Sequence, residues 1–553
     1  MTDAITREHV LRRNSTERLK FEKSPLDIIH ELPGFAVQGY EGVAEEDIVR
    51  LKWYGLYHDK PKTGYFMLRV KTPGGLLTPA KLRTIGRLAT ELGRDYGEIT
   101  TRQNIQLHWL ELSRLPDVFA RLTAAGFNQA GSCGDTVRNI TGCPVAGVDA
   151  AELFDVTPVL RDAARFFDGN RDYADLPRKL KITITACPHL CTLPEINCIS
   201  LIGVRYQSRL GFAVRVGGGL SSVPRIARGL GVFVEPTDAV PVLRAILDVW
   251  KDTLKYRLSR VKARIKFMME DVGPEEFRRL VEVRLGRALE DGPSVEPLPG
   301  GHEPGVHAEK TSGFYYIAVP VTVGLVNGPQ QLRLADLAER LGGEIRLTRE
   351  QNFILTHVPT AEVEPTVREL AAIGFPLDVN RLRAVSIACT GSPLCNFAVS
   401  LTKPRLVQIM DHLEATFGAE IEGFRINLDG CPHACAQHWI GDIGLQGTTL
   451  RERTERGEKR EAYDLYLRGG QGPTAAIGAP LVRRVPAEDA AVHIERLIRL
   501  WITERSSGEP FKAFTDRQPD ERLVAVAANV SLDDARARLR RRDSSRAEAV
   551  DVG

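Results

Sequence analysis

The chain has 553 residues, of which 43% are hydrophobic and 26% are charged, close to the average for globular proteins. Its formal net charge of +3 is too small to indicate binding to nucleic acid or to an anionic membrane. No apolar run reaches the length of a membrane span, and the N-terminus lacks the apolar stretch of a secretory signal, so we expect a cytoplasmic protein of several domains.

Composition marks the boundaries along the chain. Residues 1–45 form a polar leader, residues 291–310 are rich in Pro and Gly and indicate a linker, and residues 516–553 are charged. Interleaved Asp and Glu in this last segment favour a solvated tail over a nucleic-acid-binding arm. Between these segments we expect four domains, at 46–125, 126–290, 311–380 and 381–515.

The chain contains two copies of one unit, offset by about 245 residues. YFMLRVKTPGGLLTPAKLRTIGRLATELG followed by EITTRQNIQLHWL matches YIAVPVTVGLVNGPQQLRLADLAERLG followed by EIRLTREQNFILTHV. Each passage predicts a strand, a turn, an amphipathic helix and a strand, because its apolar residues recur at helical spacing. Those residues are Leu82, Ile85, Leu88 and Leu92 in the first copy, and Leu334, Leu337 and Leu341 in the second. Two copies also offer a cleft for a large planar cofactor.

The end of the first passage carries polar side chains at even spacing. TTRQNIQLHW (100–109) predicts a strand with Arg102, Gln106 and His108 on one face. Taken alone, this pattern is typical of a strand face exposed to solvent.

Four cysteines in the second copy form two close pairs. Cys389 and Cys395 are spaced C-x5-C, and after 35 residues Cys431 and Cys435 are spaced C-x3-C. A cubane [4Fe–4S] cluster needs one thiolate for each iron, whereas zinc sites favour two to four residues between paired ligands. Buried thiols that serve only packing are the third interpretation. In a chain without a secretory signal, metal binding is favoured over disulfides.

The first copy lacks part of this pattern. TGCPVA (141–146) aligns with TGSPLC (390–395), so Ile140 and Ala146 stand where Cys389 and Cys395 stand. KITITACPHLC (181–191) aligns with RINLDGCPHAC (425–435) and keeps both of its cysteines. Cys143 and Cys198 are candidates for extra ligands, but a relic is the favoured interpretation, with one cluster site in the second copy.

The cysteine spacing resembles that of the sulfite and nitrite reductases that carry sirohaem coupled to a cubane cluster. The resemblance runs from about residue 45 to about residue 515. It implies an α+β fold with two pseudo-twofold-related halves. Each half pairs a ferredoxin-like half-domain (46–125 or 311–380) with a larger mixed α/β sirohaem-binding domain (126–290 or 381–515), and the cofactors lie at the junction.

The resemblance also implies roles for individual residues. Cys389, Cys395 and Cys431 would bind cluster irons, and Cys435 would join the cluster to the sirohaem iron. The residues implied to hold the sirohaem are Arg102, Gln106, His108 and Lys266. The cations implied to bind the oxyanion and donate protons to it are Arg69, Arg138, Lys179 and Lys181.

The implied activity is that of an assimilatory sulfite reductase that receives electrons from ferredoxin, because no flavin or nicotinamide domain is attached. Lys181, in a Lys-x-Lys pair, favours sulfite, and so do Tyr57 and Cys133, which match a pair that is covalently joined in some members. VRNITGCPVAG instead resembles ferredoxin-dependent nitrite reductases, which are the main alternative. Precorrin-3B synthase and a non-catalytic iron–sulfur protein are further alternatives.

Overall fold

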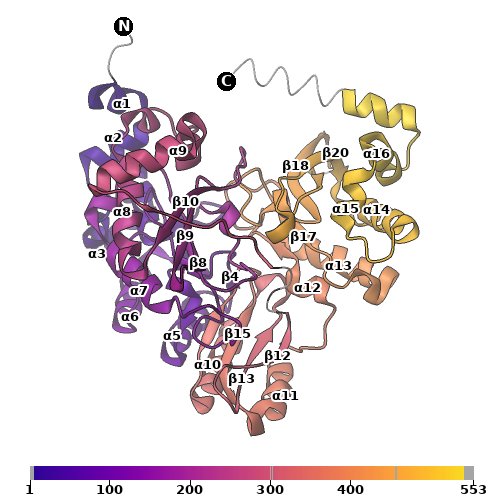
Figure 1. Cartoon of the computed structure of the whole chain (residues 1–553), viewed down its shortest axis with the longest axis horizontal. Coiled ribbons are helices and arrows are strands. Elements are labelled where there is room, and N and C mark those ends of the chain that lie inside the picture. Colours follow the sequence, from indigo (N-terminus) through magenta and orange to yellow (C-terminus); the bar gives the residue numbers. More distant parts are fainter. Residues whose placement is uncertain (1–4, 299–300, 302, 455–456, 541–553) are drawn as a thin grey trace. The chain divides into compact units, whose positions relative to one another are not determined.

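The computed structural model describes residues 5–298, 301, 303–454 and 457–540. The chain divides into two compact units (Figure 1), one comprising Met1–Gly219 with Arg225–Val379 and the other Leu220–Pro224 with Asn380–Gly553. Within the described residues, no helix has both the length and the apolar character needed to cross a bilayer.

Unit 1 begins with helices that cover part of its core. The leader forms α1 (Arg7–Arg13), α2 (Ser15–Glu22) and α3 (Leu32–Gln38). Their apolar residues Val10, Leu19, Leu32 and Phe35 are buried, and so is Ile28 between α2 and α3. Residues 5–45 therefore pack as a folded segment, although their composition suggested a polar leader.

The two ferredoxin-like passages form two antiparallel sheets in unit 1. The first sheet has the order β1-β2-β5-β4, with strands Leu56–His58, Tyr65–Val70, Ile105–Glu111 and Gly97–Ile99. The second has the order β12-β13-β15-β14-β3, with strands Gly305–Ala308, Phe314–Val319, Phe353–Pro359, Ile345–Leu347 and Leu76–Leu77. Strand β12 lies inside the segment expected to be a linker.

Each of these two sheets is extended by a short segment from the other sequence copy. Leu76 and Leu77 of the first copy pair with Arg346 and Ile345 of the second. In return, Leu325 of the second copy forms a bridge with Glu98 of the first. The exchange is reciprocal, so each copy completes the sheet of the other.

The predicted amphipathic helices are α5 (Pro79–Leu92) and α10 (Gly328–Leu341), and they pack on each other. The contact is close at Gly86, where an added Cβ would lie 3.2 Å from the carbonyl oxygen of Gly328. Leu82, Ile85 and Leu88 are buried, as are Leu334, Leu337 and Leu341, because the apolar stripe of each helix faces one shared core. Helices α6 (Leu115–Ala124) and α11 (Val363–Ile373) add to this core.

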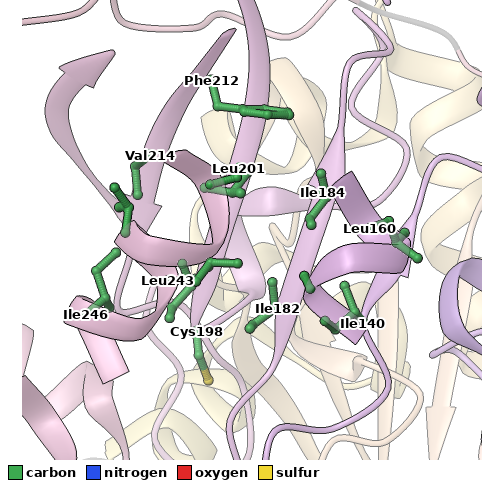
Figure 2. Packing of buried hydrophobic residues seen from close by; sticks show 14 of the residues in the cluster. Ile140, Leu160, Ile182, Ile184, Cys198, Leu201, Phe212, Val214, Leu243 and Ile246 are labelled. Carbon is green, nitrogen blue, oxygen red and sulfur yellow. The ribbon is translucent and has the colours of Figure 1, made fainter. Parts of the chain in front are cut away.

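A third sheet of unit 1 has the order β11-β10-β9-β8-β7-β6. Its strands are Glu290–Asp291, Arg228–Val234, Arg209–Val216, Ile199–Tyr206, Ile182–Thr185 and Thr141–Gly142. Helices α7 (Thr157–Phe167), α8 (Ala239–Lys251) and α9 (Ile265–Leu285) pack on it. Figure 2 shows its core, in which Ile140, Leu160 and Ile184 lie together beside the strands.

Unit 2 repeats this arrangement with the sheet β16-β17-β18-β19-β20. Its strands are Ile387–Ala388, Ile426–Asp429, Ile443–Arg453, Lys459–Leu467 and Ala479–Pro486. Its helices are α12 (Arg381–Val385), α13 (Lys403–Phe417), α14 (Ala490–Glu504), α15 (Phe511–Arg517) and α16 (Asp520–Ala528). Leu523, Val524 and Ala527 are buried, so α16 is a packed helix within the segment expected to be a charged tail. Residues 541–553 of that tail lie outside the described residues.

Candidate functional site

The four cysteines of unit 2 follow two neighbouring strands. Cys389 comes directly after β16, and Cys431 and Cys435 come after β17. The two strands are parallel, with Ala388 opposite Leu428. Because parallel strands end at the same edge of a sheet, both cysteine loops start from one edge.

Short backbone contacts hold the two cysteine loops together. The Gly430 N–H donates to Cys389 Sγ at 3.2 Å, and the Val399 N–H donates to the Gly430 carbonyl at 2.9 Å. An added Cβ at Gly430 would lie 2.8 Å from the Ala398 Cβ, which is too close for an unshifted side chain. Glycine at 430 therefore lets the Cys389–Cys395 loop approach the Cys431 loop.

Asp429, the last residue of β17, fixes the second loop. Its carboxylate accepts hydrogen bonds from the Ala436 N–H at 2.7 Å and the His438 N–H at 3.1 Å. It also contacts His438 Nδ1 at 2.9 Å. The two backbone bonds hold the segment that contains Cys431 and Cys435 in a closed turn.

The four thiols act on one another electrostatically. Burial, followed by the charges of Asp429 and Cys435, raises the pKa of Cys389 well above its ordinary value. Burial in the same way raises the pKa of Cys431 to about 12, with contributions from Cys435 and Cys395. The structure therefore brings Cys389, Cys395, Cys431 and Cys435 into one neighbourhood. A neutral thiol there would have to lose its proton on binding metal.

The predicted cations gather in unit 1, and strand pairing explains how. Val137 and Leu180 form a parallel bridge, and the Arg138 N–H donates to the Leu180 carbonyl at 2.8 Å. Arg138 therefore lies beside the Lys179–Lys181 segment, although the residues are about 40 positions apart in the chain. Lys181 directly precedes β7 and is influenced by the charge of Lys179.

Arg102 belongs to a turn, which corrects the prediction of a strand over 100–109. Strand β5 begins only at Ile105, because Gln103 has a positive φ of 55° that breaks the extended backbone. The turn directs the guanidinium of Arg102 toward the third sheet. Its Nη1 donates to Asn197 Oδ1 at 3.0 Å, and its Nη2 donates to the Asn139 carbonyl at 2.5 Å.

Positive charges act on one another within this group. Burial, then the neighbouring cations Arg102 and Lys179, lower the pKa of Lys181 well below its ordinary value. Burial lowers the pKa of Arg102 to about 9, and Arg138 contributes to that shift. Burial, then Arg264, lowers the pKa of Lys266 to about 7. A nearby anion would raise these depressed pKa values and stabilise the charged forms.

Arg69 connects the cations to a tyrosine and a cysteine. Its Nε and Nη2 donate to Gln106 Oε1 at 3.0 and 2.6 Å, and its Nη1 donates to Cys133 Sγ at 2.6 Å. Tyr57 and Cys133 share a hydrogen bond, and burial, then the charge of Cys133, raises the pKa of Tyr57. Burial alone would raise the pKa of the Cys133 thiol, but the guanidinium groups of Arg69 and Arg138 outweigh it and lower that pKa.

His108 is enclosed by two carboxylates. Its Nδ1 lies 2.7 Å from Asp59 Oδ1, and its Nε2 lies 3.3 Å from Glu98 Oε1. Glu98 also accepts a hydrogen bond from Gln106 Nε2 at 2.5 Å. Both ring nitrogens are thus engaged by protein groups, and His108 supports Gln106 through Glu98.

Stability should depend on pH through His108. Burial lowers the pKa of His108, but hydrogen bonds to Asp59 and Glu98 outweigh it and raise the pKa from 6.5 to about 9. This shift corresponds to about 3 kcal/mol, which is fully present below pH 6.5 and is lost as the pH rises through 9. Between about pH 6 and about pH 10 we expect the wild type to lose about 3 kcal/mol more unfolding free energy than His108→Gln, measured by urea denaturation. Equal losses in the two proteins would contradict this account.

One residue of the cation group, Arg264, was not predicted from the sequence. Arg264 donates from Nη2 to Cys198 Sγ at 3.1 Å, and it influences Arg102, Lys181 and Lys266. Arg264 is separated from Lys266 by one residue in KARIKF, so the basic spacing was a signal for it. Lys266 is the second residue of α9, and its Nζ donates to the Gly219 carbonyl at 3.3 Å.

Two family models match the chain twice each. The nitrite and sulphite reductase 4Fe-4S domain matches residues 133–289 and 379–544, and the nitrite/sulfite reductase ferredoxin-like half domain matches residues 58–125 and 307–373. The repeat predicted from the sequence thus corresponds to two domain types in duplicate, and the predicted α+β class with repeated ferredoxin-like halves is confirmed. The match to the first model implies an iron–sulfur cluster.

Similar proteins cover nearly the whole chain. A sulfite reductase [ferredoxin] of Mycobacterium tuberculosis is 32% identical over 538 residues, covering 92% of this chain and 96% of the relative. A ferredoxin–nitrite reductase of Leptolyngbya laminosa is 35% identical over 524 residues, covering 92% of this chain and 100% of the relative. The solved structure of the M. tuberculosis NirA protein superposes with a TM-score of 0.87 at 32% identity, covering 92% of this chain and 97% of that one. The chain belongs to the nitrite and sulfite reductase family.

Proposed function

We propose that this chain is an assimilatory sulfite reductase that uses ferredoxin and reduces sulfite to sulfide with six electrons. The observation that carries the proposal is the half-buried group of cations around Arg102 and Lys181 in unit 1. Among the described residues, the strongest charge effects on these two residues come from other cations and the Cys198 thiol. A site of this kind suits a polyanionic cofactor together with a small oxyanion.

The cation group fits sirohaem, whose carboxylates need buried positive partners. The Nε atoms of Arg102 and Arg264 are buried donors with no hydrogen-bond partner among the described residues. We propose that Arg102 and Lys266 bind cofactor carboxylates and that Gln106, supported by His108, orients Arg69 beside them. In unit 2, Cys389, Cys395 and Cys431 would bind cluster irons, and Cys435 would supply the thiolate shared with the sirohaem iron. When bound, the two groups supply electrons and an open iron position.

The remaining cations have two tasks in this proposal. Arg69, Arg138, Lys179 and Lys181 attract the oxyanion, and the lysines donate protons as each oxygen leaves as water. The lowered pKa of Lys181 suits this second task, because a lysine of ordinary pKa gives up its proton reluctantly at neutral pH. An electron-transfer protein without a substrate would leave this cation group without a role.

Sulfite is proposed over nitrite because of Lys181 and the Tyr57–Cys133 pair. Nitrite reduction is the second candidate, since curated relatives of comparable identity are named for each substrate. The test is to compare kcat/KM for sulfite and nitrite with purified, cofactor-replete protein and reduced ferredoxin. If kcat/KM for sulfite divided by kcat/KM for nitrite is well above one, the result supports sulfite. If this ratio is well below one, the chain is assigned to nitrite reduction. If the protein reduces neither anion, the proposal is overturned.

We also propose that Tyr57 and Cys133 become covalently joined. The proposal is supported by the hydrogen bond between Tyr57 and Cys133 and by Arg69, which donates to the Cys133 thiol and has its guanidinium 5.8 Å from the centre of the Tyr57 ring. Forming the C–S bond removes the thiol hydrogen and one ring hydrogen, and an oxidant such as dioxygen takes up the electrons. Mass spectrometry of digested protein should find the two peptides joined and lighter by those hydrogens. Unmodified Tyr57 and Cys133 peptides from active protein would contradict the covalent link. Cys133→Ala is the control, because it cannot form the link.

A further inference from the structure

The first copy contains a set of potential metal ligands. The alignment of TGCPVA with TGSPLC paired them with the wrong residues of the second copy. Aligning KITITACPHLC with RINLDGCPHAC equates β7 with β17, so Ile184 corresponds to Leu428. In the sheets, Gly142 lies opposite Ile184 and Ala388 lies opposite Leu428. The residue after each pair is Cys143 in the first copy and Cys389 in the second. Cys143 therefore occupies the place of Cys389, and the alignment that put Ile140 there is wrong by three residues.

The turn that follows gives the partner of Cys395. In the second copy, the Cys395 N–H donates to the Gly391 carbonyl at 3.0 Å, and the Ala398 N–H donates to the Cys395 carbonyl at 3.2 Å. In the first copy, the same pattern runs from Asp149 to Val145 at 3.0 Å and from Glu152 to Asp149 at 3.4 Å. Each turn begins two residues after the first cysteine of its copy, at Val145 after Cys143 and at Gly391 after Cys389. Asp149 thus stands where Cys395 stands.

The CPHLC and CPHAC loops have the same backbone conformation. Leu190 and Ala434 have positive φ values of 52° and 54°, and Leu193 and Gln437 have values of 50° and 63°. Residues other than glycine rarely adopt this conformation, so two occurrences at one spacing are a specific match. A hydrogen bond closes each loop, from Ile196 to Leu193 at 3.2 Å and from Ile440 to Gln437 at 3.1 Å.

The four first-copy side chains share one neighbourhood. Cys143, Cys187, Cys191 and Asp149 all act electrostatically on the phenol of Tyr316 in β13. Cys143 and Cys187 are 4% and 1% exposed, whereas Cys191 and Asp149 are half-buried. The set thus extends from the core to the surface. All nine cysteines of the chain lie in the described residues and are thiols, not disulfides.

The correspondence with the cysteine set of unit 2 favours a cluster over a single ion. A zinc ion gathers four donors at about 2.0–2.3 Å around one point. A cubane instead presents a separate iron to each ligand and so spans a wider cage. The family model for the 4Fe-4S domain matches residues 133–289 as well as 379–544.

We propose that Cys143, Cys187, Cys191 and Asp149 bind a second iron–sulfur cluster, with the carboxylate on the fourth iron. This goes beyond the proposed sulfite reductase activity, which needs only the cluster of unit 2. Thiolates are the ligands that select iron–sulfur clusters, and a carboxylate binds iron less firmly. The iron bound to Asp149 is therefore the one released first on oxidation.

The test counts iron and acid-labile sulfide per chain in full-length protein prepared anaerobically and reconstituted with ferrous iron and sulfide. We expect about eight cluster irons in the wild type and about four in either Cys187→Ser or Cys389→Ser. Dithionite-reduced Cys389→Ser should keep an electron paramagnetic resonance signal from the first-copy cluster. Four cluster irons in the wild type, no loss in Cys187→Ser, or zinc in place of iron would overturn the proposal. These counts do not depend on whether sulfite is turned over.

A second variant covers the case in which Cys187→Ser fails to fold. Asp149→Cys supplies a fourth thiolate and should retain about eight irons. Mild oxidation of the wild type should produce the signal of a three-iron cluster, and Asp149→Cys should abolish that signal. An unchanged signal would show that Asp149 is not a ligand and would overturn the proposal.

Discussion

Replacing Cys389 with alanine is expected to remove about four irons from each chain and to reduce sulfite turnover to background. Cys389 is held by the Gly430 N–H at the junction of two loops, and no other cysteine follows β16 until Cys395. A cluster that loses one of its four thiolates in a half-buried site cannot be retained at full occupancy. Iron analysis and the visible spectrum measure the loss directly.

Ser392→Ala is the matched control for this change. Ser392 lies in the same loop, three residues after Cys389, and contacts Glu461 through its hydroxyl at 3.5 Å. We expect it to keep the iron content and the activity of the wild type. Full iron content in Cys389→Ala would exclude that thiol as a ligand.

The second large effect is expected at Lys181. Replacing Lys181 with methionine keeps the length of the side chain but removes its charge and its proton. We expect kcat for sulfite to fall about 100-fold or more, which is within the range for the loss of a general acid. Because burial and then the neighbouring cations hold the pKa of Lys181 well below 10.5, the wild-type rate should also decline on the alkaline side well below that pH.

Two further variants separate the roles of charge and proton at this position. Lys181→Arg keeps the positive charge but holds its proton too firmly to donate it, so it should bind sulfite with a nearly normal KM and turn it over slowly. Lys62→Met removes an exposed lysine that faces Glu45 at 3.9 Å, and should behave as the wild type. If Lys181→Met matched Lys62→Met, Lys181 would not be a proton donor.

Local patterns predicted much of the fold and the grouping of the four unit 2 cysteines. The apolar periods of α5 and α10 and the spacing of Cys389, Cys395, Cys431 and Cys435 are contained in short stretches of sequence. Contacts between distant segments were not predictable in this way. The enclosure of His108 depends on Asp59, which reaches it across about 50 residues, and nothing in either stretch marks the pair.

Register was the main source of error. Sequence letters alone aligned TGCPVA with TGSPLC, because both contain Thr-Gly followed by Pro. The hydrogen bonds of β6 and β16 require an alignment shifted by three residues, which places Ile140 in the core of Figure 2 and Cys143 at the loop. The leader was likewise underestimated, because its buried ion pair of Lys20 with Glu17, at 2.6 Å, appears in sequence as surface charge.

The exchanged strands of the ferredoxin-like copies have a consequence for how this molecule arose. If the duplicated ancestor was a half-length protein, β3 and the residue equivalent to Leu325 would have crossed between two separate subunits. Fusion of the genes would then have turned a symmetric dimer contact into an internal one. Either present-day half, produced alone, would expose the edge of β14 or β4 and the facing surface of α5 or α10. The two halves should therefore fold as partners, and should reassemble when supplied as separate chains.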